Sequence, residues 1–584
     1  MSNTTKGMRK SLGGDSRPSA TIDRFGGLDA TPPRGGEMRA TAIENFRVHQ
    51  NGTISKRCGF SPLFRISDPI RAHIRTRIDG IPYLFLLAGN RVFSLSLTGK
   101  IFSPSGRISS ATGGAHFFYH EGDLFLWATD TLYRVGINSL TSVLGYVPLI
   151  GRDWPNDEIG EPYEPVNFLH DQVRISYIMG DPPSIFLCSP YPIKSIHSVT
   201  VNGEVVPPER YEQDDHLNTV NLLSGKAGDR ITVHLSVNFG YEQERSAFAN
   251  AGCSIPFGKA DGERLCCWSQ HSVPFMFTSR RITEEQLSES RLLAPNSVSV
   301  YFPVGNQFQI GDGRYFIRGA TRDRDRMLVF TEGNTWMVTE SDSTTEIFPT
   351  SGVNADIGTP SPGGVTRAGK HTVSVGNAAM YRWSDAQSGA YFAERLSDKI
   401  APFLSYSFYN RATVTYYEAE DELWFLDDYF GTVWILRPQT GDWYTFQGIP
   451  ATELLDLGEY MGFISSDGIY YFNREARADQ WKAEDPRPIR ALYRADFGDM
   501  GSEKVKTLSH LVLRGTPSEA ALSVEISEPF SDSFLTTVIR PREEGGYPEG
   551  RIRLPHRRLR QGALTLRAED EGAPVIRRLG LYTQ

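Results

Sequence analysis

The sequence has few cysteines and lacks any long apolar run. Five cysteines occur among 584 residues, which is too few for the disulfide framework that holds small secreted domains together. No stretch approaches the roughly 18 consecutive apolar residues of a membrane-spanning helix. Residues 1–10 carry charges, but no apolar segment follows them, so we expect no secretory signal. These absences favour synthesis in a reducing cytoplasm.

Several motifs of catalytic and cofactor sites are also missing. There is no Cys-x-x-Cys pair, and the adjacent Cys266 and Cys267 must point to opposite faces of a strand. Gly311-Asp-Gly313 precedes an expected strand rather than a helix, so it offers no helix N-terminus to a phosphate. No Gly-x-Ser-x-Gly elbow occurs. We therefore expect no metal site, no cofactor and no enzymatic activity.

The chain also lacks the basic excess of a nucleic-acid coat. Its 61 Lys and Arg residues stand against 69 Asp and Glu residues, which gives a formal net charge of −8. A protein that grips the phosphate backbone over a large surface is normally basic. This balance argues against a general DNA-binding coat, but it permits DNA to pass through a channel that does not hold it.

What the sequence does contain is a repeated pair of short strands joined by a tight polar turn. Leu124–Trp127 and Leu132–Val135 form one pair, and similar pairs lie near residues 327–338, 423–436 and 461–472. Where nothing is inserted, the spacing is roughly 40–50 residues, the period of β-propeller blades. Such a sheet cannot bury both faces alone, whereas sheets stacked around an axis share a core. The sequence therefore predicts an all-β protein built on a six- or seven-bladed β-propeller.

The repeat is interrupted once and ends before the C-terminus. Val199–Val205 and Gly228–Leu235 alternate around Asn-Gly and Gly-Asp breaks, which predicts a small inserted antiparallel β-sandwich. Leu522–Ser527 alternates with one polar face, as expected of a C-terminal β-sandwich. The predicted parts are an N-terminal arm and first-strand segment over 1–60, propeller over 61–165, the inserted sandwich over 166–257, propeller again over 258–485, and the C-terminal sandwich over 486–584.

Two short helices are expected among the strands. Thr283 and Gln286 have the spacing of a capping box, and Pro295 ends the helix that they begin. A second helix is expected to start at Ser397 and to end before Pro402.

The N-terminal arm has a composition unlike the rest of the chain. Residues 1–40 are rich in Ser, Gly and Arg and show scarcely any apolar periodicity. A segment of this kind orders only when it meets a partner, and otherwise it stays a solvated tail. We expect the arm to reach a neighbouring subunit, with the solvated tail as the alternative.

Two groups of charged residues are candidates for a DNA channel or an interface. Acidic side chains on both sides of strand 423–426 would repel a phosphate backbone if they were multiplied around a ring, and a glycosidase would need such carboxylates in pairs: Glu420, Asp421, Glu422, Asp427 and Asp428. In turns such acids are commonly solvated. An arginine-rich run would meet an acidic neighbour or nucleic acid, unless it is a solvated strand face: Arg551, Arg553, Arg557, Arg558 and Arg560.

Short motifs in a fixed order resemble those of a known family. Gly26-Gly27-Leu28 is followed by Asn45-Phe46-Arg47 and by Lys56-Arg57-Cys58-Gly59-Phe60. This order resembles the opening of short-tailed bacteriophage tail proteins, which usually have Pro where this chain has Cys58. Met327–Val338 resembles a blade of the same proteins, and Gly352–Ile400 is similar to their hub or DNA-stabilisation proteins.

The resemblance implies a hub or nozzle, also called a tail tubular protein, of a bacteriophage tail. Several copies, six by family expectation, would form a ring that continues the DNA channel and retains the genome until ejection. The partners implied are a tail adaptor protein, tail fibre or spike proteins, and double-stranded DNA passing through the channel. We expect the two sandwiches to supply contacts between subunits, and the location implied is the virion tail.

Two other functions stay open at this point. A receptor- or glycan-binding propeller at a tail tip would expose aromatic side chains on its loops, with Trp424, Trp434 and Trp443 as candidates unless they pack in the core. A glycoside hydrolase that acts on the host envelope would depend on Glu420 and Asp421.

Overall fold

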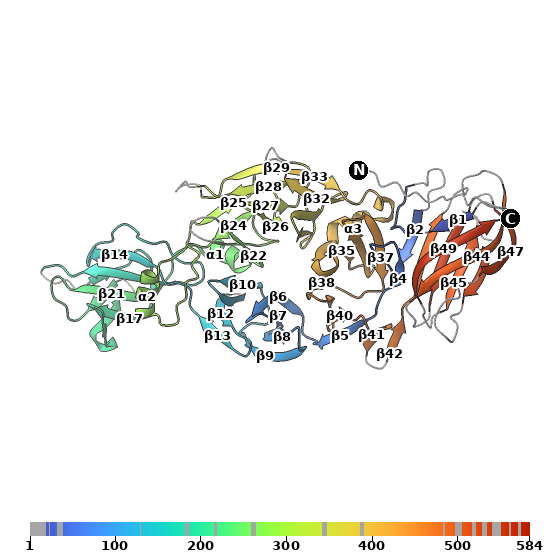
Figure 1. Cartoon of the computed structure of the whole chain (residues 1–584). Coiled ribbons are helices and arrows are strands. Elements are labelled where there is room, and N and C mark those ends of the chain that lie inside the picture. The colour runs from blue at the N-terminus through green and yellow to red at the C-terminus, as the bar shows by residue number, and fades with distance from the viewer. Residues whose placement is uncertain are drawn as a thin grey trace. The chain divides into compact units, whose positions relative to one another are not determined.

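Figure 1 presents the protein as a computed structural model in which nearly every element is a strand. The chain forms two compact units: unit 1 contains Met1–Ser67 and Ile357–Gln584, and unit 2 contains Asp68–Asp356. The structure describes residues 19–22, 24–31, 39–128, 130–181, 186–214, 219–258, 264–341, 347–385, 391–482, 485–496, 505–516, 521–527, 534–539, 551–559, 562–569 and 574–583.

Unit 2 contains four sheets of four antiparallel strands each, with the strands in chain order. The first strand of each sheet contacts the first strand of the next, as in propeller blades that pack around an axis. The sheets are β6 (Ile70–Ile78), β7 (Ile81–Ala88), β8 (Arg91–Ser96) and β9 (Ile101–Arg107); β10 (Ala115–His120), β11 (Asp123–Ala128), β12 (Thr131–Val135) and β13 (Leu140–Val143); β22 (Cys253–Phe257), β23 (Arg264–Trp268), β24 (Phe275–Thr278) and β25 (Gln307–Gln309); and β26 (Ile317–Asp323), β27 (Arg326–Thr331), β28 (Thr335–Thr339) and β29 (Thr350–Asn354).

Unit 1 contains three further blades, and their first strands contact one another in the same way. They are β30 (Val365–Ala368), β31 (His371–Val375), β32 (Met380–Asp385) and β33 (Tyr391–Arg395); β34 (Thr413–Tyr417), β35 (Glu422–Asp427), β36 (Thr432–Arg437) and β37 (Asp442–Gln447); and β38 (Glu453–Asp456), β39 (Met461–Ser465), β40 (Gly468–Phe472) and β5 (Phe60–Arg65). The last blade takes β5 from just before the first blade in sequence, so the chain passes directly from one to the other. The described residues thus form seven blades, and the predicted β-propeller is confirmed.

The repeated strand pairs of the sequence are hairpins inside these blades. Leu124–Trp127 lies in β11 and pairs with β12, where Trp127 is opposite Leu132. The strands are buried on both faces: all six residues of β35 are buried. Strands that are covered on both sides become continuous apolar runs rather than alternating ones, which is why the sequence pattern was so marked.

The insertion in unit 2 has its own core between two sheets. A five-stranded sheet contains β14 (Leu149–Pro155), β15 (Gln172–Ile178), β21 (Arg230–Val237), β17 (Ile193–Val201) and β18 (Glu204–Val206), and a three-stranded sheet contains β16 (Phe186–Cys188), β20 (Thr219–Leu222) and β19 (Tyr211–Asp214). The Asn-Gly turn is formed by Asn202 and Gly203, both with positive φ. The predicted inserted sandwich is confirmed.

The limits of the insertion differ from the predicted 166–257 at both ends. β14 precedes residue 166 and pairs in parallel with β15 through an irregular register. The sequence pattern did not predict this strand, because the residues around it are rich in Pro and Gly. At the other end β22 pairs with β23 and belongs to a blade. Between them, α1 (Glu242–Ala249) buries Phe248 against Phe168, Phe277 and Phe302.

One of the two expected helices is confirmed and the other is wrong. α2 (Glu284–Leu293) is capped by Thr283 in a capping box with Gln286. Residues 398–400 form a turn instead of a helix, and the 3-10 helix η2 (Ala401–Phe403) follows it with Pro402 inside. Pro suits the first turn of a helix because its missing N–H would be unpaired there anyway. The next helix, α3 (Tyr406–Arg411), is capped by Ser405, whose side chain accepts a hydrogen bond from the backbone N of Phe408. No helix of the described residues is long and apolar enough to span a membrane.

The C-terminal part of unit 1 is the expected β-sandwich, but the N-terminal segment supplies part of both its sheets. One sheet contains β3 (Phe46–Val48), β4 (Ile54–Lys56), β49 (Val575–Thr583), β44 (Lys506–Thr516) and β47 (Arg551–Leu559), with β1 (Ser19–Ile22) also paired to β49. The other contains β2 (Arg39–Glu44), β43 (Ala491–Asp496), β48 (Ala563–Ala568), β45 (Leu522–Ser527) and β46 (Phe534–Ile539). A hairpin of β41 (Ala478–Lys482) and β42 (Asp485–Pro488) precedes them.

β2 joins the propeller to the sandwich. Its residue Glu44 pairs with Thr445 of β37, and Ile43 pairs with Tyr493 of β43. A single nine-stranded sheet therefore runs from a blade into the C-terminal sandwich. Phe25 and Leu28 are buried in the same core. The described residues among 1–40 thus pack within their own chain, whereas residues 1–18 lie outside the described residues, and the expected contact of the arm with a neighbouring subunit stays a prediction.

Candidate functional site

Asn45 links the N-terminal segment, the blade of β34–β37 and the sandwich. Its backbone is left-handed, with φ 56°. The side-chain Oδ1 accepts hydrogen bonds from Arg57 Nε and from the backbone N of Gln447, both at 2.8 Å. Its Nδ2 donates to the backbone O of Arg490 at 2.8 Å. One amide thus satisfies polar groups from three segments that lie far apart in sequence.

Arg57 forms a second link, to β41. Its two guanidinium nitrogens Nη1 and Nη2 each lie 2.7 Å from a different oxygen of Asp479. Both residues are buried, and a bidentate guanidinium–carboxylate pair is the geometry in which such burial is best compensated. Gly59 follows, and a Cβ there would stand 1.9 Å from the carbonyl O of Ala478. Only glycine lets the two backbones approach this closely.

Arg47 leads to a buried ion-pair network around Glu422. The carboxylate of Glu422 is completely buried, and it lies 2.6 Å from Arg47 Nη2 and 2.7 Å from Arg437 Nη2. Tyr444 Oη donates to Oε1 at 2.5 Å and Trp424 Nε1 donates to Oε2 at 3.0 Å. Burial alone raises the pKa of Glu422, but the charge and hydrogen bonds of Arg47, together with Arg437 and Tyr444, hold the pKa below its ordinary value.

The structure brings some of the predicted acidic residues together and separates others. Glu420 ends the 3-10 helix η3 (Glu418–Glu420) and lies 3.1 Å from Arg474 and 3.6 Å from Arg47. Asp421 accepts hydrogen bonds from Tyr416 Oη at 2.8 Å and Gln439 Nε2 at 2.7 Å. Asp427 and Asp428 lie at the other end of β35.

The acidic cluster does not present one charged face. Glu422 is completely buried, so it is not a channel-lining residue, in contrast to the prediction. Burial raises the pKa of Asp427, with Asp428 adding to the effect. Asp428 is half-exposed and pairs with Arg411 at 2.8 Å. These carboxylates are therefore mainly compensated by arginines of the same unit.

The arginine-rich run lies on the edge strand β47, which pairs with β44. The backbones of Arg551, Arg553, Arg557 and Arg558 belong to that strand. Their side chains and the whole of Arg560 lie outside the described residues. Their predicted contact with DNA or an acidic neighbour stays a prediction.

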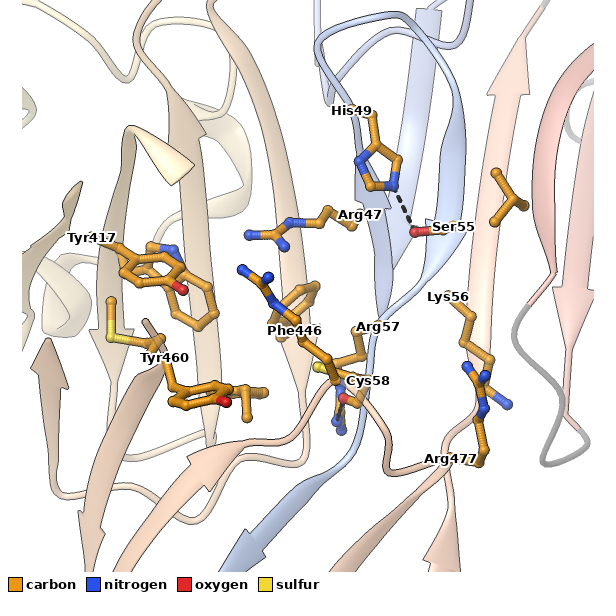
Figure 2. Close-up of a pocket in the computed structure, with 15 residues that line it drawn as sticks. Arg47, His49, Ser55, Lys56, Arg57, Cys58, Tyr417, Phe446, Tyr460 and Arg477 are labelled. Carbon is orange, nitrogen blue, oxygen red and sulfur yellow. Dashed lines mark hydrogen bonds between the residues drawn. The ribbon is translucent and has the colours of Figure 1, made fainter. Parts of the chain in front are cut away.

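A cavity of about 360 Å³ opens beside the Arg47 network, between strands of the last two blades and the N-terminal segment (Figure 2). Tyr417 and Tyr460 lie on one side of it in this view, Lys56 and Arg477 on the other, and Arg47 between them. Among the described residues, six of its lining side chains are basic or histidine and none is acidic: Arg47, His49, Lys56, Arg57, Arg474 and Arg477. Sequence reasoning missed this site, although the resemblance motifs contain three of these residues, Arg47, Lys56 and Arg57.

His49 lines this cavity, and its surroundings favour the neutral form of its imidazole. Its Nε2 lies 2.7 Å from Ser55 Oγ. Burial lowers the pKa of His49, and the charges of Arg47 and Arg437 lower it further. Cys58 also lines the cavity, and burial raises the pKa of its thiol. The permanent charge at the cavity therefore comes from arginine and lysine.

Other candidate side chains have structural surroundings. Trp424 and Trp443 are buried and Trp434 is partly buried, so the first two are core residues. Cys266 and Cys267 are buried on β23. His116 and His120 are four residues apart but lie on strand β10. In the part of the chain that the structure describes, no group of three or more His, Cys, Asp or Glu residues has the arrangement of a metal site.

Comparison with known proteins adds no family. No protein-family model matches the chain, and no curated protein does. Solved structures with some likeness include the AfRom2 CNH domain (8% identity, 71% of this chain and 99% of that one, TM-score 0.32). A chain of the mitotic checkpoint complex (9%, 76% and 98%, TM-score 0.33) and apo AztD from Citrobacter koseri (10%, 71% and 97%, TM-score 0.31) are others. At these scores the likeness carries no functional argument.

Proposed function

We propose that the chain is a structural subunit of a bacteriophage tail, a hub or nozzle that forms a homo-oligomeric ring around the DNA channel. The observation that supports this proposal is the position of the resemblance motifs. Asn45, Arg47, Arg57 and Gly59, which carry the resemblance, all stand at the junction between the propeller and the sandwich. Residues that join the propeller to the sandwich within one chain suit a protein with a mechanical function.

The geometry of this junction fits a rigid building block. The nine-stranded sheet continues from blade to sandwich, and hydrogen bonds across a sheet resist sliding of its strands. The buried pairs Arg57–Asp479 and Arg47–Glu422 fix the register of the segments that they join. We propose that six such subunits retain the packaged genome, with an adaptor protein above them and fibre or spike proteins at their sides.

Electron microscopy tests the ring. The purified full-length chain is expected to form closed rings with a central hole, and particles assembled without it are expected to lose their DNA to added nuclease. Monomers at all concentrations together with full DNA retention in particles that lack the protein would refute the proposal.

We also propose that the chain has no glycosidase activity. Both oxygens of Glu422 accept hydrogen bonds from arginines, and Asp421 is held by Tyr416 and Gln439. Turnover of an envelope polysaccharide that is abolished by Glu420→Gln and Asp421→Asn would contradict this. The alternative of a glycan-binding propeller is favoured by one observation, the cavity beside Arg47.

A further inference from the structure

We propose that the cavity between the N-terminal segment and the last two blades binds a sugar acid, a carboxylate-bearing sugar of about one or two rings. The cavity measures about 360 Å³, at the lower end of the roughly 300–1,000 Å³ range of small-molecule pockets. It has room for a small ligand rather than for a folded partner. The site does not depend on ring formation.

The donors around the cavity select an anion. No carboxylate of the described residues lines it, whereas guanidinium groups of Arg47, Arg57, Arg474 and Arg477 do. Guanidinium groups donate hydrogen bonds and accept none, and their planar shape fits a carboxylate in a bidentate way. A ligand here must therefore be rich in acceptors, which disfavours cations and gives a sugar acid the advantage over a neutral sugar.

Acidic residues outside the cavity lining orient Arg57 and Arg47. Asp479 holds Arg57 through two contacts of 2.7 Å, and Glu422 holds Arg47 at 2.6 Å. These acids compensate the cost of burying the cations while they leave the front of the cavity basic. Guanidinium groups that are fixed in advance lose less conformational entropy when a ligand arrives.

Two exposed arginines line the cavity in addition to Arg47 and Arg57. Arg474 makes one ion pair, with Glu420 at 3.1 Å, and it is exposed. Arg477 is exposed and has no ion pair among the described residues. A carboxylate that enters the cavity meets these two side chains first.

Aromatic side chains form the opposite wall. Tyr417, Trp424, Tyr460 and Phe472 line the cavity, and Figure 2 shows Tyr417 and Tyr460 opposite Lys56 and Arg477. Tyr460 packs against Tyr471 edge to face at 5.3 Å, which fixes its ring. A flat apolar wall opposite a cationic rim matches a sugar ring whose C–H face packs on aromatic carbon while its carboxylate meets the arginines. A simple anion such as phosphate uses only the rim.

Calorimetric titration of the full-length chain with glucuronate, N-acetylneuraminate, glucose and inorganic phosphate tests the site. At least one sugar acid is expected to bind saturably, and glucose at least about tenfold more weakly. Arg477→Ala should weaken sugar-acid binding about tenfold, the usual loss for one charge-assisted hydrogen bond. Arg367→Ala, an exposed arginine of β30 away from the cavity, should change nothing.

A second variant separates a sugar site from a plain anion site. Tyr460→Leu is expected to weaken sugar-acid binding and to leave phosphate binding unchanged. The proposal is overturned if neither sugar acid binds, if phosphate binds as tightly as glucuronate, or if Arg367→Ala weakens binding as much as Arg477→Ala. Rings without sugar-acid binding would refute this site alone, and monomers that bind glucuronate would refute the ring alone.

Discussion

At the scale of single residues, compensation of buried charge governs unit 1. The carboxylate of Glu422 accepts five hydrogen bonds, two from Arg47 and one each from Arg437, Tyr444 and Trp424. Such a network contributes little when it is complete, since desolvation offsets the attraction. Removing one partner is costly, because the remaining charges stay buried without compensation. Glu422, which the sequence places among the acidic residues of a turn, is thus the buried centre of an ion-pair network.

Glu422→Gln should lower the free energy of unfolding by about 3–5 kcal/mol, because the substitution removes the nearest opposite charge from Arg47 and Arg437 and leaves them only Glu420, at 3.6 and 3.7 Å. Urea unfolding of the purified chain measures the change. Asp428→Asn is the matched control, since its pair with Arg411 is half-exposed and should cost less than about 1 kcal/mol. An equal loss of unfolding free energy in the two variants would contradict the prediction that the burial of the Glu422 network makes its disruption costly.

At the scale of elements, the N-terminal segment is held by close backbone approach. At Gly27 a Cβ would stand 2.4 Å from the backbone N of Trp443, the residue that accepts the hydrogen bond of Leu28 N at 2.7 Å. The neighbouring Gly26 has nothing within 4 Å of an added Cβ. The close packing against β37 therefore requires glycine at position 27 but not at position 26.

Gly27→Ala should destabilise unit 1 by roughly 2 kcal/mol or more, because the methyl group forces the segment away from β37. Gly26→Ala should stay within about 0.5 kcal/mol of the unsubstituted chain, since the added carbon enters open space. Thermal unfolding and hydrogen exchange of Trp443 report the two effects. A similar loss in both variants would rule out close packing as the cause.

At the scale of the whole molecule, buried histidines are expected to make unit 2 less stable in acid: His116, His170 and His234 are buried among its described residues. Burial lowers the pKa of His116 and His170 to about 4. Burial, with the charges of His197 and His170 as further causes, lowers the pKa of His234 to about 3. In the unfolded chain these groups titrate near roughly 6.5, so the unfolded state binds more protons over the interval between.

Stability of unit 2 should therefore be complete above pH ~6.5 and fall as the pH drops toward about 4. Three protons give a slope of about 4 kcal/mol per pH unit at the steepest. Chemical unfolding at a series of pH values measures it, and His116→Phe should remove about a third of the slope. A flat profile between those pH values would show that the histidines are solvated.

The sequence by itself determined the β-propeller, the inserted and C-terminal sandwiches and the capped helix α2. Those features depend on local periodicity, turn residues and caps, which a few neighbouring residues specify. The predicted helix starting at Ser397 was wrong because Pro402 was interpreted as the end of a helix, whereas it lies in the first turn of η2.

Only the tertiary structure decided where the N-terminal segment lies and what surrounds the acidic cluster. β2 pairs with strands about 400–450 residues further along the chain, and no local pattern encodes such a partner. In the same way Arg47 meets Glu422, and Arg57 meets Asp479, across separations of 375 and 422 residues. Whether a carboxylate is solvated or buried, and whether basic residues form a cavity, depends on these distant contacts.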